Sequence, residues 1–171
     1  SEVGGITGRT ESYESQVYNT YVNAKINGIA HSVGGIVGYV NNAYDSASRS
    51  SAVRLSGVYN STVTGKTNVG GLIGRTDIDV DTTKYYGNYV HATVSGDENS
   101  ISLGIGANPN YNLSIRNLYI YKYSKINGEN PDEANETFIS KDNYLTANDL
   151  KASSTYTNRL EWPSGAWDFS V

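Results

Sequence analysis

Small and apolar residues alternate with polar ones in four short stretches of residues 1–128. In each, a small residue, a β-branched aliphatic residue and a glycine occupy every second position, as in residues 61–65, STVTG. This period-two pattern places the small and aliphatic side chains on one face of an extended strand. No part of residues 1–128 has the 3.6-residue period of a helix, so the pattern predicts an all-β body. The stretches end at Gly28, Gly65, Gly96 and Gly128.

A six-residue word of glycine and aliphatic residues recurs between these stretches. It reads VGGITG at 3–8, VGGIVG at 33–38 and VGGLIG at 69–74, with a degenerate form, ISLGIG, at 101–106. The last glycines of the words are 30, 36 and 32 residues apart, and the glycines that end the alternating stretches are 37, 31 and 32 apart. Two markers with nearly equal spacing predict an array of about four repeated units.

The word itself predicts a corner in the chain. Its first and fourth positions are aliphatic, as Val33 and Ile36 are, and a straight strand would direct them to opposite faces. Both can point inward if the chain turns at the glycine pair, where access to positive φ and the missing Cβ atoms let corners stack closely. Each unit is then one coil of a parallel β-helix, with Gly34-Gly35 near Gly70-Gly71. The alternative is a β-meander or sandwich with glycine-rich hairpins.

The glycines of the words are thus expected to have a structural role, and so are Gly28, Gly65, Gly96 and Gly128. The glycines of the words are Gly4, Gly5, Gly8, Gly34, Gly35, Gly38, Gly70, Gly71, Gly74 and Gly106. The extra length of two units falls in the polar stretches 41–51 and 77–84, which we expect to project outward as loops.

The pattern changes after residue 128. Thr146, with Asp149 three residues later, is typical of the N-terminal cap of a short helix. Trp162 and Trp167 concentrate aromatic bulk near the end. Because the last coil of a solenoid exposes its edge and core, we predict a β-solenoid over 1–128 and, in the same domain, a C-terminal cap over 129–171 whose tryptophans pack on the last coil. An aromatic platform for a ligand is the alternative role for this segment.

Composition limits the chemistry. The 171 residues carry a net charge of −4 with no basic block, which disfavours nucleic acid and anionic membrane surfaces as partners. No apolar run approaches the roughly 18 residues of a membrane span. Cysteine is absent, which excludes disulfides, thiolate metal sites and thiol nucleophiles. Methionine is absent too, and Ser1-Glu2 stands directly before a word, so we expect a piece of a longer protein.

The words VGGIVG and VGGLIG, each preceded by an alternating stretch, resemble the GLUG motif, named for Gly-Leu-hydrophobic-Gly. GLUG arrays occur in large bacterial surface proteins, prominently in the IgA1-specific zinc metalloproteases of Gram-positive cocci and their relatives, and also in adhesins. The tail, NDLKASSTYTNRLEW at 148–162 and WDFS at 167–170, is similar to the stretch that follows such arrays. The resemblance covers nearly the whole chain and implies a protein that is secreted or attached to the cell wall.

The same resemblance implies that any proteolytic chemistry lies elsewhere in a longer parent. Zinc metalloproteases of this kind need the pattern HExxH, with two histidines one helical turn apart and a glutamate base. Here only His31 and His91 are present, and neither is followed by glutamate. We therefore expect no catalytic residue and no cofactor in this chain, zinc only in the parent's protease domain, and structural or solvent-facing roles for both histidines.

Three carboxylates, Asp77, Asp79 and Asp81, alternate in a polar stretch and share one face if it is extended. They are weak candidates for calcium ligands, because the glutamate that closes an EF-hand loop is missing, and a solvated loop is the alternative. A carbohydrate-active site would need a carboxylate pair, for which Asp77 and Asp81 with Arg75 are the candidate group. Arg9 and Arg75 follow repeat words at equivalent places, which favours a structural or exposed role.

Tyrosine is abundant, at 15 residues, and several tyrosines fall at similar places in successive units. This spacing predicts a stacked ladder, which either covers the wall of a solenoid or forms a recognition face for protein or glycan. Its expected members are Tyr18, Tyr21, Tyr59, Tyr89 and Tyr121.

Three functional hypotheses follow. The first is a non-catalytic β-helical module of a secreted or surface IgA1-protease-like metalloprotease, which recognises host immunoglobulin or braces the adjacent domains of its parent. The second is a stalk or adhesin segment of a bacterial surface protein, with another surface protein as partner. The third is a free-standing carbohydrate-active enzyme with a β-helix fold.

Overall fold

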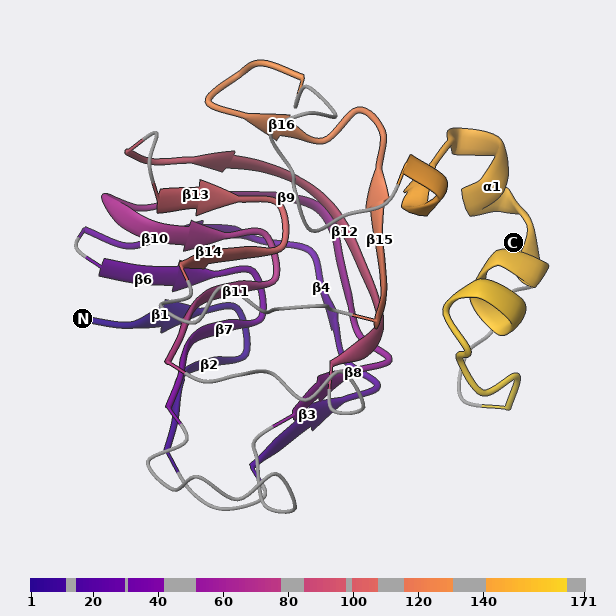
Figure 1. Ribbon diagram of the computed structural model, residues 1–171, viewed down its shortest axis with the longest axis horizontal. Coiled ribbons are helices and arrows are strands. Elements are labelled where there is room, and N and C mark those ends of the chain that lie inside the picture. The colour runs from indigo at the N-terminus through magenta and orange to yellow at the C-terminus, as the bar shows by residue number, and fades with distance from the viewer. Residues whose placement is uncertain are drawn as a thin grey trace.

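The computed structural model describes residues 1–11, 15–29, 31–41, 52–77, 85–97, 100–107, 116–130 and 141–165. In these ranges the chain is all-β, with strands in parallel sheets and little helix, as predicted (Figure 1). The loops expected over 41–51 and 77–84 lie outside the described residues apart from their first positions.

Two four-stranded sheets and one seven-stranded sheet contain most of the strands. The first sheet has the order β1 (Val3–Gly4), β6 (His31–Gly34), β10 (Thr67–Gly70) and β13 (Ile101–Ser102). The second has the order β14 (Ile105–Ala107), β11 (Ile73–Thr76), β7 (Val37–Val40) and β2 (Thr7–Thr10). All of these strands pair in parallel.

The seven-stranded sheet is also parallel. Its order is β17 (Tyr144–Leu145), β15 (Arg116–Tyr121), β12 (Tyr86–Ser95), β9 (Gly57–Thr64) and β4 (Tyr21–Val22), with β16 (Lys125–Ile126) on β12 and β5 (Lys25–Asn27) on β9. A separate parallel pair joins β3 (Gln16–Tyr18) to β8 (Ala52–Arg54). None of these sheets closes on itself.

The repeat words lie side by side in register. Gly34 pairs with Gly4 on one side and with Gly70 on the other, so the glycine pairs are neighbours, as the sequence predicts. Strand β6 ends at Gly34 in one sheet and β7 begins at Val37 in another, which places a corner between them. Val33 and Ile36 are both fully buried, so the first and fourth positions of the word point inward.

Close backbone approach, and not positive φ, explains the second glycine of each word. Among the described glycines only Gly87 and Gly128 have positive φ, and neither belongs to a word. A Cβ at Gly35 would lie 2.8 Å from Cγ2 of Val58 and still closer to the carbonyl oxygen of Gly71 in the next unit. The corners therefore stack at a separation that admits only hydrogen at this position.

The alternating stretches are aligned as well. Val63 pairs with Ile26 and with Val94, and Val94 pairs with Ile126, so the aliphatic residues of all four stretches form one row. Aliphatic side chains from the large sheet and from the repeat words then share one core. Its fully buried members include Val33, Ile36, Val58, Leu72, Val90, Leu103 and Ile120.

The C-terminal tail contains a short 3₁₀ helix η3 (Lys141–Asn143), strand β17, helix α1 (Ala147–Lys151) and a π-helical turn η4 (Thr155–Arg159). Thr146 caps α1 as predicted: its Oγ1 accepts from the Asp149 amide, and the Thr146 amide donates to the Asp149 carboxylate at 2.7 Å. The pKa of Asp149 is lowered because its carboxylate accepts a hydrogen bond from the Thr146 hydroxyl at 2.6 Å and the one from the Thr146 amide. Strand β17 covers the edge of β15, so this part of the tail closes an exposed sheet edge.

The placement of Trp162 differs from the prediction. We expected it on the last coil, but its ring lies against Gly57 of β9, and its Nε1 donates to the carbonyl oxygen of Gly87 at 2.7 Å. The helical part of the tail thus lies along the outer face of the seven-stranded sheet (Figure 1). That face presents tyrosine rings against which the tail buries apolar side chains. Trp167 lies outside the described residues.

Candidate functional site

The outer face of the seven-stranded sheet carries two adjacent rows of aromatic residues. On β12, Val90 is buried in the core, so Tyr89 and His91 on either side of it point to the opposite face. Tyr89 lies in register with Gly57, which lies in register with Tyr21. The absence of a side chain at Gly57 leaves a gap in this row, and Trp162 of the tail lies over it.

The second row begins at Tyr21, which the two rows share, and forms a continuous aromatic ladder. The ring centroids of Tyr21 and Tyr59 are 5.9 Å apart, those of Tyr59 and His91 5.1 Å, and those of His91 and Tyr121 4.2 Å. Tyr123 extends the ladder, with its centroid 5.5 Å from that of Tyr121. We call Tyr21, Tyr59, His91, Tyr121 and Tyr123 the aromatic ladder.

Two predicted members lie outside the ladder, and His91 and Tyr123 belong to it instead. Tyr18 lies on β3, away from the ladder, with its ring 5.7 Å from the Arg54 guanidinium. Tyr89 is 2% exposed and packs under the tail, and His91 takes its place. The sequence contains the pattern that identifies His91 as a member. The residue that follows the buried aliphatic residue is Tyr59 in β9, His91 in β12 and Tyr121 in β15.

The tail forms the opposite wall of this site. Tyr89 packs in one apolar cluster with Leu145, Leu160 and Trp162. Tyr156 lies 5.4 Å from Trp162 between ring centroids and donates its hydroxyl to the backbone oxygen of Leu150 at 2.8 Å. These contacts hold the helical turn η4 over the sheet.

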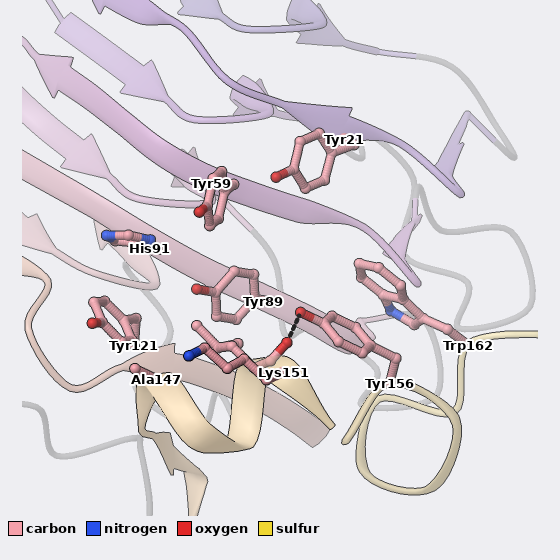
Figure 2. Close-up of a pocket in the computed structure, with 10 residues that line it drawn as sticks. Tyr21, Tyr59, Tyr89, His91, Tyr121, Ala147, Lys151, Tyr156 and Trp162 are labelled. Carbon is pink, nitrogen blue, oxygen red and sulfur yellow. Dashed lines mark hydrogen bonds between the residues drawn. The ribbon is translucent and has the colours of Figure 1, made fainter. Parts of the chain in front are cut away.

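A pocket of about 430 Å³ remains between the sheet and the tail. The sheet contributes Tyr21, Tyr59, Tyr89, His91 and Tyr121 to its lining. The tail contributes Ala147, Leu150, Lys151, Tyr156 and Trp162 (Figure 2). The volume lies within the range of small-molecule binding sites, which are typically apolar with a few placed polar groups.

The lining is almost uncharged. Burial raises the pKa of Tyr89 far above its usual value of 10.0 and that of Tyr21 to about 12, so both phenols stay neutral at physiological pH. Burial also lowers the pKa of His91 from its usual 6.5, which keeps the imidazole neutral. Among the described lining residues, Lys151 alone carries a full charge.

Two polar atoms of this lining lack partners. The hydroxyl of Tyr89 and Nδ1 of His91 are buried and have no hydrogen-bond partner among the described residues. A buried polar group without a partner costs about 1–3 kcal/mol, so each atom offers a hydrogen bond to a molecule that enters the pocket.

The lowered pKa of His91 predicts a pH dependence of stability. In the unfolded chain, where the pKa is near 6.5, His91 binds more protons than in the folded chain once the pH falls below that value. The contribution of neutral His91 to the free energy of unfolding is therefore fully present above pH 6.5. It is lost as the pH falls toward the lowered pKa of His91 in the folded chain. We expect His91→Gln to flatten this fall in unfolding free energy, measured by urea denaturation at a series of pH values.

The matched control for this measurement is His31→Gln, because His31 is exposed and contacts Thr67 outside the pocket. An equal pH dependence in the wild type and in His91→Gln would contradict the prediction. No carboxylate lines the pocket among the described residues, so no anion there offsets the charge on a protonated His91.

The other predicted site residues lie elsewhere. Asp77 accepts a hydrogen bond from Nε of Arg75 at 2.7 Å and another from the Tyr39 hydroxyl. Tyr39 lies between two guanidiniums, 4.9 Å from that of Arg9 and 5.3 Å from that of Arg75. These contacts connect β2, β7 and β11, which are neighbours in one sheet. Asp79 and Asp81 lie outside the described residues.

The described ranges contain no group of three or more histidine, aspartate or glutamate side chains arranged to hold a metal ion. Among their helices, none has the length and apolar character that crossing a membrane requires.

No protein-family model, curated protein or solved structure matches the chain. The likeness to GLUG arrays therefore rests on the repeat words and the tail alone. The site has to be interpreted from its own chemistry, which is that of a neutral aromatic pocket with two unpaired polar atoms.

Proposed function

We propose that this chain is a non-catalytic β-solenoid module that recognises a partner through the aromatic pocket and ladder. Successive units contribute strands to the same three sheets in the same order. One unit contributes β6, β7 and β9, and the next contributes β10, β11 and β12. This order and the aligned glycine pairs support a chain that winds in coils. Coils stacked by backbone hydrogen bonds provide a rigid support for a binding face.

The observation that carries the recognition role is the accessible aromatic pocket. Tyr21 and Tyr59 are 46% and 38% exposed, so a partner can reach their rings. Exposed tyrosines that stack on one another are preorganised for binding, because little side-chain entropy remains to be lost. The two buried polar atoms without partners in the lining add hydrogen-bonding groups to these aromatic surfaces.

We propose further that the parent is a secreted or wall-attached, IgA1-protease-like bacterial metalloprotease. The repeat words and the tail support this assignment through their resemblance to such proteins. The module would hold the immunoglobulin substrate or brace the protease domain, and zinc would belong to that domain.

Binding to immobilised IgA1 tests the recognition role. We expect saturable association of this chain by biolayer interferometry, and we expect Tyr59→Ala to weaken it at least about tenfold, as truncation of a central aromatic contact does. Tyr18→Ala is the matched control, because Tyr18 is 54% exposed and lies outside the ladder. Absence of association with IgA1 would contradict recognition of this antibody and leave a bracing role.

A stalk or adhesin segment is the second candidate. The stacking of successive units in register supports it, since an array of this kind lengthens by one unit at a time. The reading frame of the parent gene separates the two candidates, because an HExxH pattern in the same frame would support the protease and its absence the adhesin. The carbohydrate-active enzyme is the weakest candidate, because Asp77 is held by Arg75 and Tyr39. Lyase and hydrolase assays on polysaccharides test it.

A further inference from the structure

We propose that the pocket between the seven-stranded sheet and the tail binds a pyranose sugar residue of a glycan. This inference rests on the proposed recognition role and specifies its ligand. Three properties of the pocket support it: the tyrosine faces that line it, the two buried polar atoms without partners, and the near absence of charge.

The aromatic faces suit the shape of a sugar ring. Tyr21 and Tyr59 stack with an interplanar angle of 27°, while the His91 ring lies edge-on to Tyr59 at 85°. The lining therefore presents both ring faces and ring edges to the space between sheet and tail (Figure 2). A pyranose has an apolar C–H surface that packs against aromatic faces and a rim of hydroxyls that does not.

The unpaired polar atoms suit that rim. Tyr89 is 2% exposed, its hydroxyl has no partner among the described residues, and Figure 2 shows the hydroxyl directed toward the space between Tyr59, Tyr121 and Lys151. Nδ1 of His91 is also unpaired. A sugar hydroxyl both donates and accepts, so it can pair with the Tyr89 hydroxyl and with either tautomer of His91.

Other ligand classes fit less well. An apolar ligand would leave the Tyr89 hydroxyl and His91 Nδ1 without partners, so it would not gain the hydrogen bonds that a polar ligand can make with them. A phosphate or another multiply charged ligand would meet Lys151 as its only opposite charge in the described lining. A proline-rich peptide packs well on tyrosine, but its backbone supplies acceptors and few donors for these two atoms.

The test uses a panel of simple sugars. Methyl glucoside, methyl galactoside, methyl mannoside, N-acetylglucosamine and glucuronic acid are titrated up to roughly 20 mM, the range of weak ligands, and followed by saturation-transfer NMR and calorimetry. At least one sugar should receive saturation at its ring protons and show a measurable Kd. Glucuronic acid reports whether the charge of Lys151 contributes.

Three variants locate the binding. Tyr59→Ala should abolish saturation transfer, and Tyr89→Phe, which removes only the unpaired hydroxyl, should raise Kd about threefold to tenfold without lowering stability. Tyr18→Phe removes an exposed hydroxyl outside the pocket and should leave Kd unchanged. Circular dichroism spectra confirm that each variant is folded.

Several outcomes overturn the proposal: no sugar binds, Tyr89→Phe binds as tightly as the wild type, or a decamer of polyproline binds in place of every sugar. Failure here is distinguishable from failure of the recognition role. A chain that binds IgA1 through Tyr59 but takes no sugar would retain its recognition role and lose only this ligand.

Discussion

Gly35→Ala is expected to destabilise the fold strongly, because the corner of the repeat word has no room for a methyl group. The new Cβ would lie 2.8 Å from Cγ2 of Val58 and closer still to the carbonyl oxygen of Gly71. Because the second obstacle is backbone, no side chain can rotate to make room. The two coils would have to separate, and we expect a loss of more than about 3 kcal/mol of unfolding free energy, above the usual cost of overpacking.

The repeat provides a second position with the same geometry. A Cβ at Gly71 would lie 2.8 Å from Cγ1 of Val90 and closer to the carbonyl oxygen of Leu103, so Gly71→Ala should cost a similar amount. Gly165→Ala is the matched control, since a Cβ there meets no atom within 4 Å, and its effect should stay within about 0.5 kcal/mol. Urea denaturation followed by circular dichroism measures all three. Wild-type stability in Gly35→Ala would contradict the stacked corners.

The sequence predicts the stacking well because the same physical constraint recurs in every unit. A valine such as Val33 that lies between Val3 and Val69 experiences nearly the same surroundings as its neighbours, so the residue repeats with the structure. The spacing of two markers then determines which residues are paired. At Gly35 the missing Cβ is what the stacked corners require, and its φ is not positive.

The ladder shows where spacing alone fails. Two residues, Tyr59 and Asn60, lie between paired positions of β9, where β12 has only His91, so the register shifts there. Asn60 takes positive φ, which asparagine tolerates better than most residues. Matching the tyrosines of successive units therefore predicts Tyr89 as the ladder residue of β12, although His91 occupies that position.

The tail could not be placed from the sequence because it has no counterpart in the repeat. The hydrogen bond from Trp162 to Gly87 joins residues 75 positions apart, and no periodic pattern connects them. The local part of the tail was predictable, since the capping box of Thr146 and Asp149 depends only on residues of one helical turn. Long-range docking depends on shape, here the gap in the aromatic rows at Gly57.

Trp162→Ala is expected to release the tail from the sheet. Trp162 is 4% exposed, packs on Tyr156 and covers Gly57, so its removal leaves a large cavity beneath η4. Truncation of a buried tryptophan costs about 3–5 kcal/mol. We expect a loss of this size in urea denaturation, together with faster amide hydrogen exchange and proteolysis in 147–165 than in the β-sheet body.

Trp162→Phe separates packing from hydrogen bonding. It keeps most of the ring but leaves the Gly87 carbonyl without the Nε1 donor, and should cost about 1–2 kcal/mol. Tyr123→Ala is the control on the same aromatic face, because Tyr123 is 55% exposed and does not line the pocket. If Trp162→Ala exchanged its tail amides no faster than the wild type, the tail would not depend on this anchor. Because the tail forms one wall of the pocket, its release should also abolish ligand binding while the stacked sheets persist, which distinguishes a lost wall from a lost fold.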